Sequence, residues 1–162
     1  VIVGVSGDEA VRAAWTRLTG DVARHRPGLA LDGVLVEAMG PRGLELVVGA
    51  TRDADWGPLV LVGLGGIWIE ALHDVRLLPV DMAEADIVVE LGRLKAAAVL
   101  AGLRGAAGVD LAAIAAVVAR IGARMQADPR LLEIDINPLV AYPAGSAVPV
   151  LALDALVVAR EA

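Results

Sequence analysis

The sequence predicts an α+β fold in which a largely antiparallel sheet has helices packed on one face. Three observations predict it. Short extended runs precede two helical patterns, and further extended runs close the chain. The links between the first extended runs are too short for helical crossovers, so those strands should be antiparallel neighbours. No internal repeat or linker interrupts this order, and we therefore expect one domain over residues 1–162.

The first thirty residues predict a strand end and a helix. Val1 to Val5 is typical of the end of a strand. Ser6 and Glu9 have the spacing of a capping box, in which a hydroxyl and a carboxylate bind free N–H groups of a helix's first turn. The helix that follows has one apolar stripe, formed by Val11, Trp15, Leu18 and Val22. It should end near Pro27 and Gly28.

The rest of the chain predicts strands, two helices and strands again. Extended runs cover residues 34–39, 44–51, 59–64 and 67–72. The next two stripes are helical: Ile87, Leu91, Leu94, Ala98 and Ala101, then Leu111, Ile114, Val118, Ile121 and Met125. Asp110 is placed to cap the second of these helices. Residues 131–136 and 148–154 predict the closing strands.

The composition narrows the classes of function. The 162 residues include 20 acidic and 14 basic side chains, and this net charge of -6 argues against a nucleic-acid partner. Hydrophobic residues make up 57% of the chain, but the stretch 111–119 is far shorter than the ~20 residues that cross a bilayer. The absence of cysteine excludes disulfides and a cysteine nucleophile. With no signal peptide visible, we expect a cytoplasmic protein with no membrane partner.

The strand at residues 131–136 carries the clearest chemical pattern. Alternate residues of a strand face opposite sides, so Glu133, Asp135 and Asn137 should share the face turned away from the core. Carboxylate and amide oxygens without His or Cys suit Mg²⁺. If the closing strands pair as a hairpin, Asp154 approaches Asn137 and the two can form a metal pair. The spacing alone favours a simpler alternative, a solvated strand face with an exposed aspartate at a strand end.

Glycines and isolated carboxylates supply weaker signals. Gly63-Leu-Gly-Gly66 can bring backbone N–H groups to phosphate oxygens, but a tight hairpin needs the same residues. Trp68 and Glu70 share one strand face beside these glycines. Glu37 and Glu45 interrupt apolar runs, which fits either a ligand's ribose or amino group or the wet face of an edge strand.

A set of short motifs then resembles one family in order and spacing. The motifs are 34–39, 45–49, 51–53, 56–58, 63–70, 74–75, 102–105 and 133–139. They resemble the ATP-grasp domain of ADP-forming (NDP-forming) acyl-CoA synthetases, which is related to the beta subunit of succinyl-CoA synthetase. The resemblance runs from near Val1 to about Val157 and implies the C-terminal subdomain of an ATP-grasp fold.

The resemblance implies a Mg-ATP site between two subdomains. It also implies phosphoryl exchange with a phosphohistidine on a separate CoA-ligase domain or subunit, in the formation of acyl-CoA and ADP. Asn137 and Asp154 match the Mg²⁺-ligand positions, with Asp135 beside them and Glu70 as a supporting acidic candidate. The implied cofactors are Mg²⁺ and ATP or ADP.

The same resemblance implies residues for the nucleotide. Glu37, Ala38 and Met39 match the hinge strand whose backbone meets adenine. Gly65 and Gly66 match the glycine pair near the phosphates. Glu45 is a weaker candidate for the same nucleotide site.

The sequence also departs from the family. The family's phosphate-binding lysine lies in an N-terminal subdomain that should precede Val1, and Lys95 is on a predicted helix instead. Segment 74–79 is shortened, and Asp154-Ala-Leu156 lacks the basic residue often found after that aspartate. We therefore expect a domain truncated at its N-terminus and inactive alone.

Two alternatives stay open. One is a non-catalytic, synthetase-like regulatory domain of a GNAT-type protein lysine acetyltransferase. The other is a structural domain that contributes contacts to a homo-oligomer.

Overall fold

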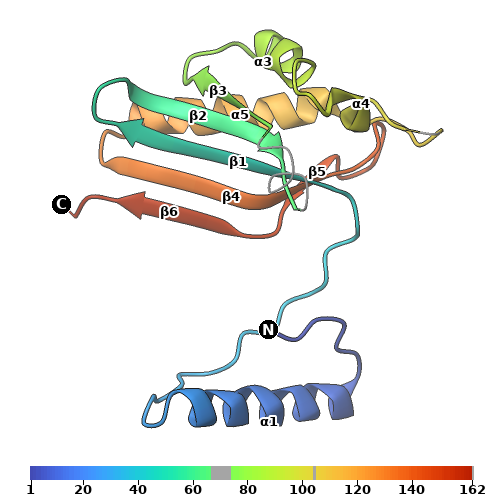
Figure 1. Ribbon diagram of the computed structural model, residues 1–162, viewed down its shortest axis with the longest axis vertical. Coiled ribbons are helices and arrows are strands. Elements are labelled where there is room, and N and C mark those ends of the chain that lie inside the picture. The colour runs from blue at the N-terminus through green and yellow to red at the C-terminus, as the bar shows by residue number, and fades with distance from the viewer. Residues whose placement is uncertain (67–73, 104, 162) are drawn as a thin grey trace. The chain divides into compact units, whose positions relative to one another are not determined.

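The computed structural model describes residues 1–66, 74–103 and 105–161. It divides the chain into two compact units, Val1–Pro41 (unit 1) and Arg42–Ala162 (unit 2). No helix among these described residues is long and apolar enough to cross a membrane. The predicted α+β class, with helices on an antiparallel sheet, is confirmed within unit 2 (Figure 1).

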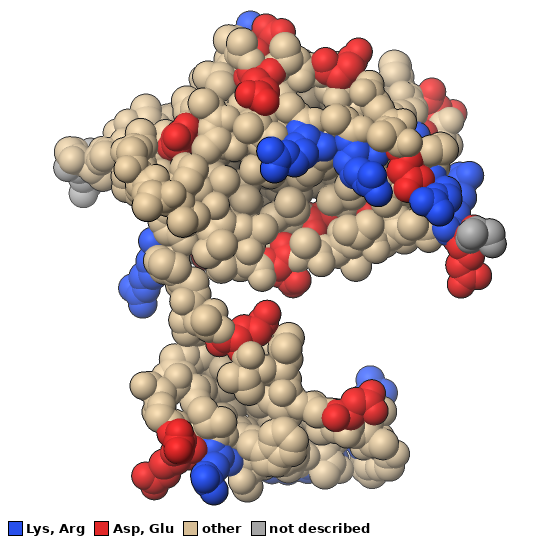
Figure 2. All heavy atoms as spheres, turned by 180° about the vertical axis from the view of Figure 1, so that it is seen from behind, with Lys and Arg blue, Asp and Glu red and all other residues tan. Residues whose placement is uncertain are grey.

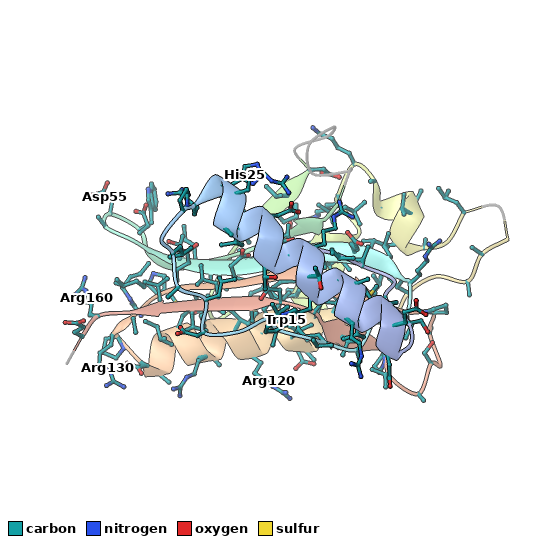
Figure 3. All side chains as sticks on the ribbon, turned by 90° about the horizontal axis from the view of Figure 1, so that it is seen from below. Trp15, His25, Asp55, Arg120, Arg130 and Arg160 are labelled. Atoms are coloured by element: carbon teal, nitrogen blue, oxygen red, sulfur yellow. The ribbon has the colours of Figure 1, made fainter. Side chains whose placement is uncertain are left out.

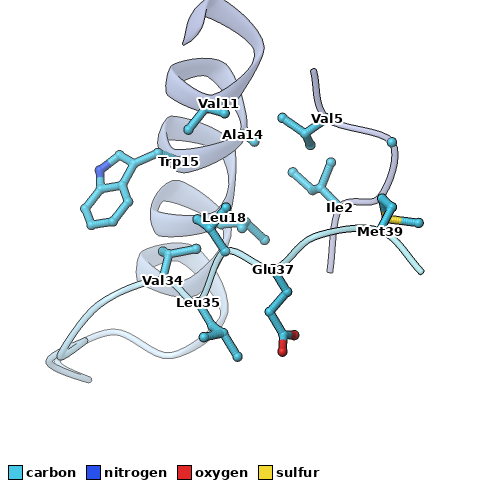
Figure 4. Close-up of a pocket in the computed structure, with 12 residues that line it drawn as sticks. Ile2, Val5, Val11, Ala14, Trp15, Leu18, Val34, Leu35, Glu37 and Met39 are labelled. Atoms are coloured by element: carbon cyan, nitrogen blue, oxygen red, sulfur yellow. The ribbon is translucent and has the colours of Figure 1, made fainter. Parts of the chain in front are cut away.

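Unit 1 is one helix, α1 (Asp8–His25), between two segments without regular structure. Figure 4 shows the apolar side of α1 lining a hollow together with Ile2, Val5 and residues of segment 34–39. No residue of α1 is buried, and the Trp15 side chain is 51% exposed. The expected strands at 1–5 and 34–39 are wrong for this structure, because neither segment pairs with a strand among the described residues.

The start of α1 differs from the expected capping box. Gly7, with φ 82°, takes the N-cap position, and no side chain caps the helix. The Val11 N–H donates to the Gly7 carbonyl at 3.1 Å, so Gly7, and not Ser6, is the residue that precedes the first helical residue, Asp8. Asp8 and Glu9 lie in the first turn, where negative charge interacts favourably with the positive end of the helix dipole.

Unit 2 is built on a six-stranded antiparallel sheet (Figure 1). The strands are β1 (Leu44–Asp53), β2 (Gly57–Leu64), β3 (Val75–Pro79), β4 (Leu131–Ala141), β5 (Val150–Ala152) and β6 (Ala155–Ala159). Their order is β3-β2-β1-β4-β5, and β6 also pairs with β4. The predicted strands at 44–51, 59–64 and 131–136 are confirmed, whereas that at 67–72 lies outside the described residues.

The predicted strand at 148–154 is wrong in its extent. Residues Val150–Ala152 form β5, and a separate strand, β6, follows Asp154. β5 pairs with the C-terminal part of β4 and β6 with its N-terminal part. Strand β3, which the sequence did not predict, pairs with β2 and ends at Pro79 on the edge of the sheet. An edge position tolerates a residue without an N–H donor.

The helices of unit 2 cover one face of this sheet. They are α3 (Glu84–Leu91), α4 (Ala97–Leu100) and α5 (Leu111–Ala127), and α5 contacts β1, β2 and β4. The single helix expected across residues 87–101 is wrong, because the chain leaves the helix at Gly92 and re-enters it after Ala96. The buried Asp74 carboxylate accepts the Ala96 N–H at 2.9 Å in this break.

α5 begins as predicted and is attached to the sheet at its other end. The Asp110 side chain accepts the Ala113 N–H, which confirms the predicted N-cap. At the C-terminus, Arg52 of β1 donates to the carbonyls of Met125, Asp128 and Leu131 at 2.6, 3.2 and 2.9 Å. A guanidinium at this position satisfies carbonyls that the helix leaves unpaired and opposes the negative end of the helix dipole.

Candidate functional site

The face of the sheet opposite α5 holds several acidic residues of unit 2 that the sequence analysis singled out. Leu46, Val48 and Ala50 of β1 face the helices and are buried. By strand alternation, Glu45, Val47, Gly49 and Thr51 face the other way. We call this second side the open face. Register places Asp135 of β4 opposite Gly49 and Glu133 opposite Thr51, so both acids share the open face as predicted.

A bulge in β4 brings Asn137 to Asp154. Val48 lies opposite Ile136 and Leu46 opposite Leu139, so Asn137 and Pro138 together oppose one residue of β1. The link between β5 and β6 passes at the same point. The Asn137 N–H donates to the Asp154 carbonyl at 3.2 Å, and the Leu153 N–H donates to the Pro138 carbonyl at 3.1 Å. The expected approach of these two residues is therefore present in the backbone.

Gly49 leaves space beside the Asp135 carboxylate. A Cβ atom built on Gly49 would lie 3.6 Å from Asp135 Oδ1 and 3.5 Å from the Ile134 carbonyl. The half-buried Asp135 side chain therefore borders a gap on the open face that any larger residue at 49 would begin to fill. A glycine inside a strand is the signal that sequence reasoning missed here, since such a glycine often marks close approach of a ligand or backbone.

The predicted nucleotide residues Glu45, Gly65 and Gly66 also lie together. The Gly65 N–H donates to the Glu45 carbonyl at 2.8 Å. A Cβ on Gly65 would come within 3.1 Å of the Leu46 backbone, and one on Gly66 would lie 2.9 Å from Glu45 Oε2. Gly66 has φ 58°, a conformation that side chains disfavour. This geometry explains both glycines locally and places the Glu45 carboxylate directly beside them.

The other predicted residues belong to unit 1 or lie outside the described residues. Glu37, Ala38 and Met39 belong to unit 1, where Figure 4 shows the Glu37 carboxylate pointing away from the apolar side chains of α1. Glu70 lies outside the described residues. Within the described ranges, no group of three or more His, Asp or Glu side chains could hold a metal ion. The described part of the candidate metal site is thus two carboxylates, Asp135 and Asp154, and the amide of Asn137.

The carboxyl groups of unit 2 whose pKa values are clearly lowered have hydrogen-bond partners away from this site. Hydrogen bonds from the Arg130 side chain and backbone, followed by its charge, lower the pKa of Asp128 to about 2. A hydrogen bond from Arg76 lowers the pKa of Glu90 and ties α3 to β3. In the β1–β2 hairpin, the Trp56 and Asp55 N–H groups lower the pKa of Asp53.

The covered side of unit 2 differs in charge from the open face. Figure 2 shows basic side chains in a row on the side seen from behind. Arg120 and Arg124 of α5 border an apolar groove floored by Ile134, Ile136 and Leu139. Figure 3 shows Arg120 and Arg130 along the same side. No acidic candidate of the site lines this groove.

Comparisons with known proteins show the family of this chain. Residues 1–158 match the family model described as an ATP-grasp domain. The chain is 45% identical over 156 residues to trans-feruloyl-CoA synthase FCS1 of an unknown prokaryotic organism, covering 96% of this chain and 22% of that protein. It is 35% identical over 142 residues to the beta subunit of acetate–CoA ligase [ADP-forming] I of Pyrococcus furiosus, covering 88% and 61%.

A solved structure shows the same fold. It is dinucleotide-forming acetyl-coenzyme A synthetase 1 of Ca. Korarchaeum cryptofilum, in complex with coenzyme A and Mg-AMPPCP. The TM-score is 0.81 at 30% identity, over 98% of this chain and 67% of that one. The chain spans less than two thirds of the length of the two curated relatives above.

Proposed function

This chain belongs to the ATP-grasp domain family of ADP-forming acyl-CoA synthetases, and from that premise we propose that its open face binds Mg-ATP for phosphoryl transfer. The observation that carries the proposal is the backbone contact between Asn137 and Asp154 at the bulge of β4. Two residues 17 positions apart in the numbering meet there, and the resemblance had named both as metal ligands.

The donor set fits Mg²⁺ by its chemistry. Asp135, Asn137 and Asp154 offer carboxylate and amide oxygens and no sulfur or imidazole, which is the ligand set that hard divalent cations prefer. Mg²⁺ needs one or two protein carboxylates and takes its other ligands from water and phosphate. Bound there, it would neutralise charge on the transferred phosphoryl group. We include Glu70 in this set on the sequence resemblance alone.

The nucleotide would extend from these residues toward Glu45. Gly66 carries no side chain, so phosphate oxygens can approach its amide group. The Gly65 N–H already donates to the Glu45 carbonyl, so Gly65 would hold this turn beside the phosphates. The Glu45 carboxylate beside Gly66 is suited to accept a hydrogen bond from a ligand hydroxyl or amino group. We assign adenine contacts to the backbone of Glu37, Ala38 and Met39, as the resemblance implies.

The reaction that we propose for the whole protein is acid + CoA + ATP to acyl-CoA + ADP + phosphate, through a phosphohistidine on a CoA-ligase domain or subunit. Names of the relatives support it: one is a synthase, another the beta subunit of an ADP-forming ligase. The Ca. Korarchaeum cryptofilum complex is described with its phosphohistidine segment pointing towards the nucleotide binding site. These names favour a catalytic parent over the regulatory alternative.

The test is turnover by the full-length protein that contains this chain. We expect ADP formation that requires acid, CoA and Mg-ATP, and loss of at least a hundredfold in turnover for Asn137→Ala and Asp154→Ala. Glu84→Gln, an exposed carboxylate in the first turn of α3 on the covered side, is the matched control and should retain turnover. A parent without acid- and CoA-dependent ADP formation would refute the reaction, and active Asn137 and Asp154 variants would refute the site.

A further inference from the structure

Strand β6 leaves one edge of the sheet uncovered. It pairs with β4 along one side, and the described residues place no strand on its other side (Figure 1). The strand, Ala-Leu-Val-Val-Ala, carries no charge, and Leu156 and Val157 are 55% and 58% exposed. Exposed apolar edge strands are templates for pairing with another chain, and natural edges usually avoid this composition.

The backbone bonds of β6 show which of its groups are free. The Asp154 carbonyl accepts from Asn137, and the Arg160 N–H donates to the Arg130 carbonyl at 2.9 Å. Backbone groups alternate in direction along an antiparallel strand, so even-numbered residues of β6 face β4. Ala155, Val157 and Ala159 therefore direct their N–H and C=O groups outward. Of these, the Ala155 N–H already donates to the Asp154 side chain.

The residues that flank β6 have opposite charges. Asp154 precedes the strand and Arg160 follows it. Among the described residues no acidic side chain forms an ion pair with Arg160. Figure 3 shows Arg160 at the end of the sheet near Arg130, whose carbonyl accepts the Arg160 N–H. In an antiparallel pair centred on Val157, residue 154 of one copy lies opposite residue 160 of the other. The sequence from Asp154 to Arg160 is therefore complementary to itself in one register.

We propose that a second copy of this chain pairs with β6 edge to edge, antiparallel and with Val157 opposite Val157. This register joins the outward N–H groups of Val157 and Ala159 to the carbonyls of Val157 and Ala155 in the other copy. It also forms two Asp154–Arg160 charge pairs, one at each end. A shift of the axis by one residue, to Leu156 or Val158, retains some backbone bonds but removes both charge pairs. Charge complementarity thus selects both the occupant and its register.

The pairing is expected to be weak. A seven-residue strand pair buries less surface than the ~1,200 Å² typical of stable interfaces, and exposed ion pairs add little to affinity. We therefore expect dissociation constants between about 1 μM and 1 mM. The inference does not rest on the proposed function, although both use Asp154. Measuring association without Mg²⁺ and nucleotide separates the two.

Sedimentation velocity of the 162-residue chain over a concentration series tests the proposal. Val157→Lys places two like charges directly opposite each other, and we expect dimerisation at least tenfold weaker. Leu77→Lys is the matched control, because Leu77 is exposed on the opposite edge strand β3. It should leave association unchanged. A chain that stays monomeric up to 1 mM, or a Val157→Lys variant that associates like the parent, would overturn the proposal.

Charge reversal and amide exchange test the register. Arg160→Asp should weaken association, and adding Asp154→Arg should restore it, because the pair is then reversed but complementary. In hydrogen exchange, the amides of Val157 and Ala159 should become slower with rising concentration. Those of Leu156 and Val158, which face β4, should not change. Failure of the double variant to recover, or equal slowing along the whole strand, would contradict this register.

Discussion

The two faces of the sheet in unit 2 are made by the same strands but carry different side chains. On the covered face, Leu46, Val48 and Ala50 of β1 pack against the helices. On the open face, alternate residues of that strand leave Gly49 beside Asp135 and Glu45 beside Gly66. Under the proposed function, alternation separates the residues that stabilise the fold from those that bind the nucleotide within one strand. Substitutions on the covered face should therefore change folding, and those on the open face should change ligand affinity.

The largest expected effect is on the covered face. Leu46→Ala removes a fully buried side chain from the core and should lower the free energy of unfolding by about 2–5 kcal/mol. Urea unfolding measures it. Leu77→Ala is the control, since that leucine is 64% exposed and its loss should cost less than about 0.5 kcal/mol. Equal destabilisation by Leu46→Ala and Leu77→Ala would contradict the claim that the covered face contributes more to stability.

The next effect concerns the arginine that attaches α5 to β1. Arg52→Ala removes three hydrogen bonds to carbonyls at the end of the helix. We expect a loss of about 2–3 kcal/mol in the free energy of unfolding, because charged hydrogen bonds contribute most when partly buried. Arg120→Ala on α5, which borders a surface groove, should change stability by less than about 0.5 kcal/mol. A neutral Arg52→Ala would show that the helix end does not need this cap.

A smaller effect should appear in acid. Because Arg130 lowers the pKa of Asp128 to about 2 from an ordinary 3.8, the ionised carboxylate stabilises the folded state. This contribution is complete above about pH 4 and should be lost as the pH falls towards 2. Asp128→Asn removes this part of the pH dependence, as measured by thermal unfolding between pH 2 and 6. If the variant still lost thermal stability between pH 4 and pH 2 as the parent does, other carboxylates would be responsible for that loss.

The smallest change in stability is expected on the open face. In Gly49→Ala the new methyl group would contact Asp135 at an ordinary distance of 3.6 Å, so the fold should tolerate it. Gly49→Val fills the gap further and should weaken Mg-nucleotide binding by the parent protein more than Gly49→Ala does. Equilibrium binding of Mg-AMPPCP to the parent measures this. If the free energy of unfolding fell from Gly49 to Gly49→Ala and Gly49→Val while the affinity for Mg-AMPPCP stayed the same, Gly49 would serve the fold and not the binding of nucleotide.

Features with strong local signals were predictable from the sequence. The apolar stripe of α5 and its Asp110 cap depend only on residues within one continuous segment, and both predictions are confirmed. Alternation in 131–137 gave the correct faces for Glu133 and Asp135, since each central strand has one core side. The meeting of Asn137 with Asp154 was also predictable, because a short connection returns the chain beside β4.

Other features depend on partners that a local pattern does not contain. Segment 34–39 alternates like a strand, but no described neighbour completes a ladder with it. The stripe from Ile87 to Ala101 continues through a break that the buried Asp74 stabilises from outside the helix. β6 pairs with β4 beyond the point where β5 ends, so β4 has two successive partners on one side. Such effects of tertiary contact leave little trace in residue periodicity.

Hydrogen exchange in the full-length protein, with and without Mg-AMPPCP, tests the central claim most directly. The account predicts that nucleotide slows exchange of amides around Gly65, Gly66, Asn137 and Asp154, with little change in α5. It also predicts that Asn137→Ala removes this protection. Protection confined to α5 and the arginine-bordered groove, with the open face unaffected, would contradict the claim that this face binds Mg-ATP.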